Sequence, residues 1–269
     1  MCGLAFIMPA MVTDQNAMMD AYTVVFDGLS HLGPGDRGLT LDIVARISPE
    51  LPARPRVADL GCGVGASTMV LAQALPGARV LALDSHAPFI ARLQNMAAAQ
   101  GLGDRIDAVV GDMAAPPSLD GTRGEFDLIW SESAIYSLGR GQAFGRWRPL
   151  LRPNGWLVFS DVVWQNEPAQ RSAQATAFWS EEYPDITTAN TIVADLRMAG
   201  FRALEPVLSG RKVWSNYYEP LRQRLEQLAQ LQQSSQALTD LMAELETEIG
   251  VYDQSGDDVA LAFFLARRD

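Results

Sequence analysis

The chain has 269 residues, of which 48% are hydrophobic, and its 32 acidic and 21 basic residues give a net charge of −11 at pH 7. This length can bury a large core within one α/β domain. Without a basic run the acidic balance disfavours nucleic acid as a partner, because phosphate binding needs clustered Lys and Arg. Two cysteines and two histidines are too few for a disulfide framework or a metal ligand set, so we expect neither.

The N-terminal part of the chain predicts helices. The opening stretch MCGLAFIMPAMV is apolar but lacks the basic region of a signal peptide. We therefore expect a cytoplasmic protein that does not associate with membranes. Helical patterns between residues 14 and 50 are interrupted at Gly28 and at Gly33-Pro34-Gly35. We predict that residues 1–50 form a helical lid over a binding site.

Residues 56–68, RVADLGCGVGAST, predict a buried strand, a glycine-rich turn and the start of a helix. Glycines let the backbone approach a ligand closely, and the free N–H groups of the helix start point toward it. As Gly61-x-Gly63-x-x-Ala66, the turn fits a variant of the dinucleotide fingerprint. Asp59 favours a different cofactor, because a carboxylate at the strand end repels a pyrophosphate and attracts a cation.

Three further strand patterns follow, each ending in polar residues. The strand at 78–84 ends in Asp84, about 20 residues after the glycine turn, where both cofactor classes place a ribose-binding acid. Residues 105–117 hold a third strand, and residues 125–139 hold a fourth strand that runs into a polar loop. The sequence has one lysine and no Tyr-x-x-x-Lys pair, so hydride-transfer chemistry is not apparent.

This order of motifs resembles the class I S-adenosylmethionine-dependent methyltransferases, whose first motif matches Asp59-x-Gly61-x-Gly63-x-Gly65. The resemblance implies S-adenosyl-L-methionine as cofactor and S-adenosyl-L-homocysteine as product. It implies that the acid after the second strand holds the ribose, that the residues after the third strand face the adenine, and that those after the fourth lie beside the methionine part. The cofactor-binding residues implied are Asp59, Gly61, Cys62, Gly63, Gly65, Asp84, Ser85, Asp112, Met113 and Ser131.

A narrower resemblance covers roughly residues 25–220. The sequence is similar to a group of bacterial class I methyltransferases with a Trp-Ser-Glu-Gly-Ala-Ile-Tyr signature. The stretches that carry this likeness are WSESAIYSLG at 130–139, GPG at 33–35, FWSEEYPDI at 178–186 and WSNYY at 214–218. Ser133 stands where the signature has glycine. If that glycine takes a positive φ angle, Ser133 would strain the loop or shift it.

The remaining elements complete an α/β pattern. Further strands are expected at 154–164, 201–209 and 258–268, and a helix at 188–200. Strands that alternate with helices predict a doubly wound, seven-stranded, mostly parallel sheet of the Rossmann-like methyltransferase type, with ligands bound at its carboxyl edge.

Leucines recur at three- and four-residue spacing between Leu221 and Leu245, which predicts a helical insertion before the last strand. This insertion packs on the sheet edge, covers the site or forms a dimer interface, so a monomer and a homodimer both remain open. Within a single domain we divide the chain into a lid segment at 1–50, a cofactor-binding core at 51–210, the insertion at 211–256 and the last strand at 257–269.

Catalytic candidates follow from the chemistry. Methyl transfer from a sulfonium needs mainly alignment in a dry site, and a base only where the acceptor loses a proton. The candidate bases are Glu132, Tyr136 and His31, although Glu132 is preferred as a ligand for the ammonium of the cofactor. We expect His86 to be exposed to solvent. The residues expected to line the acceptor pocket are Tyr136, Trp214, Tyr217 and Tyr218.

The predicted function is therefore methyl transfer from S-adenosylmethionine to a small-molecule acceptor, without a metal. Two alternatives stay open: a regulatory protein that binds S-adenosylmethionine without catalysis, and a dinucleotide-dependent oxidoreductase. The sequence does not identify the acceptor or its reacting atom.

Overall fold

The computed structural model describes residues 15–118, 125–231 and 235–269, so the apolar N-terminal stretch lies outside the described residues. The α-helices are α1 (Gln15–Phe26), α2 (Arg37–Ile47), α3 (Ala66–Ala74), α4 (Ala87–Ala99), α5 (Arg140–Trp147), α6 (Ala173–Glu182), α7 (Ala189–Met198), α8 (Lys212–Ala229) and α9 (Gln236–Ser255). The 3-10 helices are η1 (Ser48–Glu50), η2 (Ile135–Ser137), η3 (Arg148–Leu150) and η4 (Pro168–Gln170). The strands are β1 (Arg56–Leu60), β2 (Arg79–Asp84), β3 (Ile106–Val110), β4 (Phe126–Ser131), β5 (Leu151–Trp164), β6 (Thr187–Thr188), β7 (Phe201–Ala203), β8 (Val207–Leu208) and β9 (Val259–Arg268).

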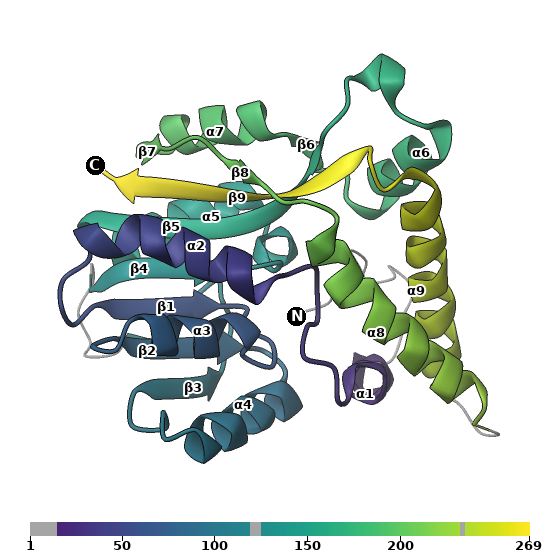
Figure 1. Ribbon diagram of the computed structural model, residues 1–269, viewed down its shortest axis with the longest axis horizontal. Coiled ribbons are helices and arrows are strands. Elements are labelled where there is room, and N and C mark those ends of the chain that lie inside the picture. Colours follow the sequence, from purple (N-terminus) through teal and green to yellow (C-terminus); the bar gives the residue numbers. More distant parts are fainter. Residues whose placement is uncertain (1–14, 119–124, 232–234) are drawn as a thin grey trace.

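The described residues form one mixed sheet with the strand order β3-β2-β1-β4-β5-β9-β7 (Figure 1). Its first five strands are parallel, and β9 runs antiparallel between β5 and β7. The sheet has nine strands instead of the predicted seven, because the two-residue strands β6 and β8 are added beside β5 and β9. The strand expected at 201–209 is split into β7 and β8 around Pro206, which has no N–H to donate to a neighbouring strand.

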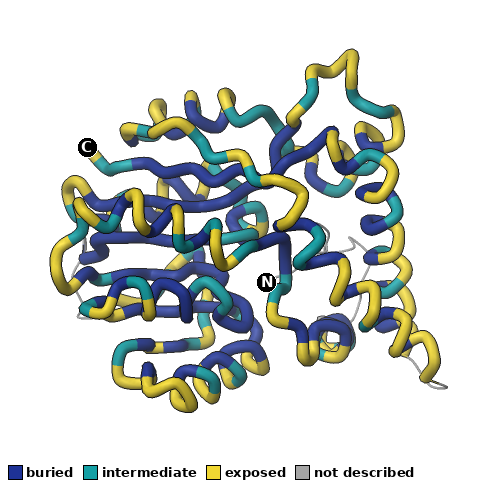
Figure 2. Tube along the Cα trace, viewed as in Figure 1, coloured by how far each residue is buried: buried dark blue, intermediate teal, exposed yellow. Residues whose placement is uncertain are grey.

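Helices cover both faces of the sheet. Side chains alternate between the two faces of a strand, so each face has its own apolar layer. Val57 and Val80 pack with apolar residues of α2, α3 and α4, whereas Ala58 and Leu81 pack with those of α5 and α7. Figure 2 shows the central strands buried along their length and the outer faces of the helices exposed. Burial on both faces explains the nearly continuous apolar runs of these strands.

The helices α1, α8 and α9 stand beyond the carboxyl ends of the parallel strands and pack on one another (Figure 1). An aromatic cluster joins α6, α8 and α9: Trp214 stacks on Tyr218 and Tyr252 with ring centroids 5.8 and 5.3 Å away, and Trp179 meets Trp214 at 6.4 Å. Leu231 departs from the predicted leucine pattern, because it follows the end of α8 and is exposed. The cluster fixes α8 and α9 over the carboxyl edge of the sheet.

A buried acid lies within this helical layer. Glu248 of α9 accepts a hydrogen bond from the Tyr218 hydroxyl at 2.7 Å, and burial raises the pKa of Glu248 to about 8. The unfolded chain releases the same proton at about pH 4.3. The native state therefore binds this proton more tightly, and the stability it contributes is lost as the pH rises through about 8.

Glu248→Gln is expected to remove this pH dependence, because a neutral amide has no proton to release. The free energy of unfolding of the variant relative to the parent should rise between pH 5 and 8 by up to about 1.4 kcal/mol per pH unit, and then level off. Thermal unfolding at several pH values measures this difference. The matched control is Glu246→Gln, an exposed position on the same helix. A parallel pH dependence of Glu248→Gln and the parent would contradict the prediction.

Candidate active site

The turn between β1 and α3 takes a left-handed backbone at three glycines, with φ of 77° at Gly61, 52° at Gly63 and 88° at Gly65. Residues with a Cβ are strained in this conformation, which explains the spacing of the glycines. The N–H groups of Gly61 and Cys62 both donate to the Leu83 carbonyl, at 2.8 and 3.0 Å. The turn is thus held against the carboxyl end of β2.

Asp84 fixes the same turn from the end of β2. Its Oδ2 accepts the Gly63 N–H at 2.9 Å and its Oδ1 accepts the His86 N–H at 2.9 Å. His86 is buried, which corrects the expected exposure, because its Nε2 lies 2.8 Å from the Thr23 hydroxyl of α1. The Ser85 hydroxyl is buried and has no hydrogen-bond partner in the described part of the chain. Helix α1 therefore reaches the predicted ribose side of the site.

Asp59 lies fully buried beneath the glycine turn. The Thr68 hydroxyl donates to its Oδ2 at 2.5 Å, whereas Oδ1 is buried with no hydrogen-bond partner among the described residues. Burial, with smaller contributions from the negative charges of Glu132 and Asp84, raises the pKa of Asp59 to about 7. A buried carboxylate oxygen without a partner is costly, and a donor or cation supplied by a ligand would satisfy it. The residues therefore fit a cationic ligand at this turn.

Other predicted cofactor residues lie at the ends of neighbouring strands. Asp112 is exposed after β3, and the next residue, Met113, is buried and accepts the Trp147 indole N–H on its carbonyl at 2.7 Å. At the end of β4 the Ser131 hydroxyl donates to the Leu60 carbonyl at 2.9 Å. The Ser131 hydroxyl thus joins β4 to β1, and its side chain is buried.

Glu132 connects three elements through one carboxylate oxygen. Its Oε2 accepts hydrogen bonds from Ser67 at 2.7 Å, from Thr40 at 3.2 Å and from the Trp130 indole at 3.2 Å. Its Oε1 faces the Gly35 turn, where an added Cβ would lie 3.1 Å away. Burial raises the pKa of Glu132 to about 7 in spite of these donors. The sequence suggested Glu132 itself, but not Thr40 or Ser67, which hold it in place.

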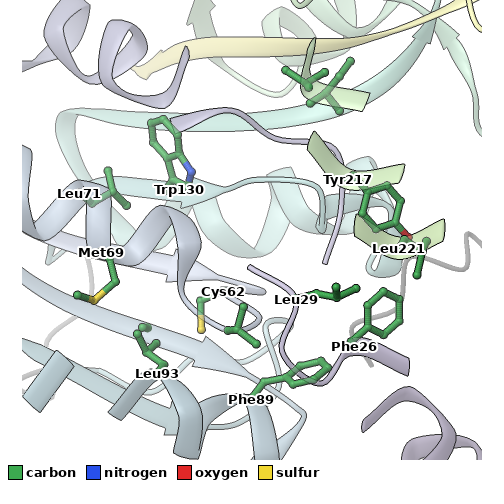
Figure 3. Close-up of a cluster of buried hydrophobic side chains, with 14 of the residues drawn as sticks. Phe26, Leu29, Cys62, Met69, Leu71, Phe89, Leu93, Trp130, Tyr217 and Leu221 are labelled. Atoms are coloured by element: carbon green, nitrogen blue, oxygen red, sulfur yellow. The ribbon is translucent and has the colours of Figure 1, made fainter. Parts of the chain in front are cut away.

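A cavity lies over the glycine turn, between the carboxyl edge of the sheet and α1. Figure 3 shows Phe26, Phe89 and Cys62 among the buried apolar side chains of this region. The cavity is lined by Asp59 and residues of the 61–67 turn, by Tyr22, Phe26 and residues 30–35 above it, and by Phe89, Glu132 and Ser133. Tyr22 and Phe26 were not predicted as site residues, although the apolar spacing within 15–26 was a signal for a buried face of α1.

Ser133 has a φ of 52°, so this residue does adopt the positive φ that was considered for it. Two hydrogen bonds hold this strained backbone: the Ser133 N–H donates to the Ser160 hydroxyl at 2.8 Å, and its own hydroxyl donates to the Pro34 carbonyl at 2.8 Å. The second bond joins the loop after β4 to the turn that covers the cavity.

The covering turn is also fixed from α8. The Gly35 N–H donates to the Val213 carbonyl at 3.1 Å, and Asn216 donates to the Gly35 carbonyl at 2.9 Å and to Asp36 at 3.0 Å. Lys212 forms an ion pair with Asp36 at 2.7 Å. The beginning of the insertion thus positions the turn above Glu132.

His31 and Tyr136, two of the predicted bases, occupy different surroundings. His31 lines the cavity, its Nδ1 lies 3.1 Å from the Ser30 hydroxyl, and burial lowers its pKa while Asp36 opposes that shift. Tyr136 packs edge-on against Tyr183 with ring centroids 6.1 Å away, and does not belong to the lining of this cavity.

The aromatic residues predicted for the acceptor pocket are buried within the helical layer. Trp214, Tyr217 and Tyr218 are at most 2% exposed. Their rings are occupied by contacts with one another and with neighbouring helices, so they support α8 from within and do not line the cavity. The aromatic walls come instead from Tyr22, Phe26 and Phe89.

Neither a metal-binding cluster nor a membrane-spanning helix occurs among the residues that the structure describes. No group of three or more His, Cys, Asp or Glu side chains is arranged to hold a metal ion among them. None of their helices is both long and apolar enough to cross a bilayer.

Comparisons with known proteins agree with this geometry. Residues 57–155 match the family model described as a methyltransferase domain. The chain is 30% identical over 188 residues to a trans-aconitate 2-methyltransferase of Streptomyces avermitilis, an alignment that covers 68% of this chain and 67% of that protein. A protein of the same name from Streptomyces coelicolor is 35% identical over 133 residues, which span 48% of this chain and 42% of the relative.

The fold has close relatives among solved structures. An S-adenosylmethionine-dependent methyltransferase from Geobacter sulfurreducens, solved in complex with S-adenosyl-L-homocysteine, superposes with a TM-score of 0.78 at 18% identity and covers 93% of this chain and 98% of that one. The glycine turn, the carboxylates at the strand ends and these matches lead to one conclusion: the chain belongs to the class I S-adenosylmethionine-dependent methyltransferases.

Proposed function

We propose that the chain transfers the methyl group of S-adenosylmethionine to a small-molecule acceptor that reaches the cavity beside His31 and Glu132. The buried, unpartnered Oδ1 of Asp59 at the glycine turn is the observation that carries this proposal, because it calls for a cationic ligand at this point. When bound, S-adenosylmethionine supplies an electrophilic methyl group on a sulfonium leaving group.

In this proposal different residues bind different parts of the cofactor. Asp59 and the Oε1 of Glu132 attract the ammonium of the methionine part. Cys62 and Gly63 line the same cavity, and Ser131 precedes Glu132 at the end of β4. The carboxylate of Asp84 keeps lone pairs for the ribose hydroxyls beyond its two backbone bonds, since a carboxylate offers about four acceptor positions. Ser85 extends the ribose side, and Asp112 with Met113 borders the adenine.

We propose a role for each of the four segments into which the sequence divides the chain. Residues 51–210 form the cofactor-binding core with the last strand at 257–269, and the described part of the predicted lid, residues 15–50, acts as a lid. The anchoring of the Gly35 turn by Ser133 and Asn216 supports a lid that rests on the insertion at 211–256. We also propose that the protein works in the cytoplasm, as a monomer or a homodimer.

The cavity favours His31 as the base where the acceptor loses a proton. Burial lowers the pKa of His31, so its imidazole is neutral near pH 7 and can accept a proton. We do not assign Glu132 as the base, because its Oε2 already accepts three hydrogen bonds and holds the side chain in place. Trans-aconitate is the first acceptor to assay, since two relatives carry that substrate in their names.

Asp59→Asn tests the cofactor site. The variant should bind S-adenosylhomocysteine about 1.5–3 kcal/mol more weakly at pH 8, the usual size of a lost hydrogen bond to a charged group. The affinity of the parent should rise from pH 6 to pH 8, because Asp59 and Glu132 have a pKa of about 7 and attract the ligand's ammonium only when ionised. The variant should show a flatter pH dependence.

Titration calorimetry at pH 6, 7 and 8 measures both effects. Asp104→Asn, at an exposed acid, is the matched control and should bind like the parent. Unchanged affinity in Asp59→Asn would refute the assignment. Tight binding of NADH instead of S-adenosylhomocysteine would revive the oxidoreductase alternative.

His31→Gln tests the base. Transfer of a labelled methyl group to an acceptor from a bacterial metabolite extract that reacts through a hydroxyl, thiol or amine should fall about 10²–10⁴-fold at saturating cofactor. Transfer to a carboxylate of trans-aconitate, which has no proton to lose, should stay near the parental rate. The affinity for S-adenosylhomocysteine should stay within about twofold of the parent, because Asp59 and Glu132 carry the ammonium.

The exposed variant Asp27→Asn serves as control for this assay. An unchanged rate of transfer to an acceptor that must lose a proton would contradict the role of His31 as the base. Binding of S-adenosylhomocysteine without methyl transfer to any acceptor would favour the regulatory alternative.

A further inference from the structure

A second cavity of about 260 Å³ opens beside the cofactor cavity, between α2, α3 and α4. These three helices lie on the same face of the sheet (Figure 1). Ser30, His31, Ser67 and Glu132 line both cavities. A molecule bound in the second cavity can therefore extend one end to His31 and Glu132, where we place the methyl transfer.

Two arginines line the second cavity, Arg37 at the start of α2 and Arg92 in α4. Arg37 donates to the neutral Gln73 amide at 2.9 Å, and Gln73 donates in turn to Gln100 at 2.8 Å. Neither arginine forms a salt bridge within the described residues, whereas Arg140 is paired with a buried carboxylate at 2.8 Å.

Glu132 also lines this cavity, but its Oε2 accepts hydrogen bonds from Ser67, Thr40 and Trp130 and from neither arginine. Two arginines without an ion pair in the described part of the chain favour an anionic ligand here.

The rest of the lining selects the shape of that ligand. Val64, Met69, Val70 and Met96 give the same cavity an apolar lining. Small-molecule sites commonly combine such apolar walls with a few polar groups that fix the orientation. A guanidinium binds a carboxylate through two parallel N–H donors, which makes arginine suited to this recognition.

We propose that the second cavity is the acceptor subsite and that it selects small carboxylic acids. The carboxylate lies at Arg37 and Arg92, the apolar body of the acceptor contacts Met69 and Met96, and the reacting end points to His31. This inference rests on the proposed methyl transfer and adds the chemical class of the acceptor to it.

Arg37→Gln and Arg92→Gln test the subsite by calorimetry on the protein saturated with S-adenosylhomocysteine. The probes are phenylacetate, hexanoate and glutarate, each compared with its amide. At least one acid should bind the parent, its amide should not, and each variant should bind that acid at least about tenfold more weakly, as expected for the loss of a charge-assisted bidentate contact. Arg46→Gln, at an exposed position of α2 outside the cavity, is the matched control and should bind like the parent.

Three results would overturn the proposal: none of the acids binds, an acid binds equally well to the parent and to both variants, or the amides bind as tightly as the acids. The affinity for S-adenosylhomocysteine itself forms a separate arm. A tenfold loss of that affinity in the variants would assign the arginines to the carboxylate of the cofactor and refute an acceptor subsite. Failure of the parent to bind S-adenosylhomocysteine would refute the proposed function instead.

Discussion

The Oε2 atom of Glu132 holds the site together, because it accepts hydrogen bonds from α2, α3 and β4 at once. Thr40 comes from the N-terminal segment, Ser67 from the helix after the glycine turn and Trp130 from the sheet. A single carboxylate therefore sets the distance between the covering segment and the cofactor turn. Because Oε2 already accepts three hydrogen bonds, it has a structural role. Oε1 faces the Gly35 turn and the cavity, so the two oxygens of one side chain have different roles.

The cover of the cavity depends on a second constraint, the positive φ of Ser133. A glycine would adopt this backbone more easily, but it could not donate to the Pro34 carbonyl. The serine therefore has a strained backbone, but its hydroxyl forms a hydrogen bond that joins the loop after β4 to the Gly33–Gly35 turn. Asn216 holds the same turn from α8, so the helical insertion contributes to the site without lining it.

Burial raises the pKa of several acids in this protein. The pKa of Asp59 and of Glu132 is raised to about 7, and that of Glu248 to about 8, in each case mainly by burial. A group with a raised pKa costs stability when the pH rises and it must ionise. At the glycine turn a bound cation would offset this cost, whereas Glu248, enclosed by the aromatic helical layer, keeps its proton near neutral pH.

The sequence by itself determined the glycine turn, the strand-end acids and the alternation of strands and helices, because these depend on local backbone chemistry and on residue spacing along one element. It also raised the question of a positive φ at Ser133, and the structure shows this φ. Only the tertiary structure decided which side chains meet: Thr40 and Ser67 on Glu132, Thr23 on His86, and Tyr22 and Phe26 in the cavity wall in place of Trp214, Tyr217 and Tyr218. An aromatic or hydroxyl residue has the same sequence neighbours whether its side chain lies in the core or in a binding site. Only the packing of distant segments decides which of the two places it takes.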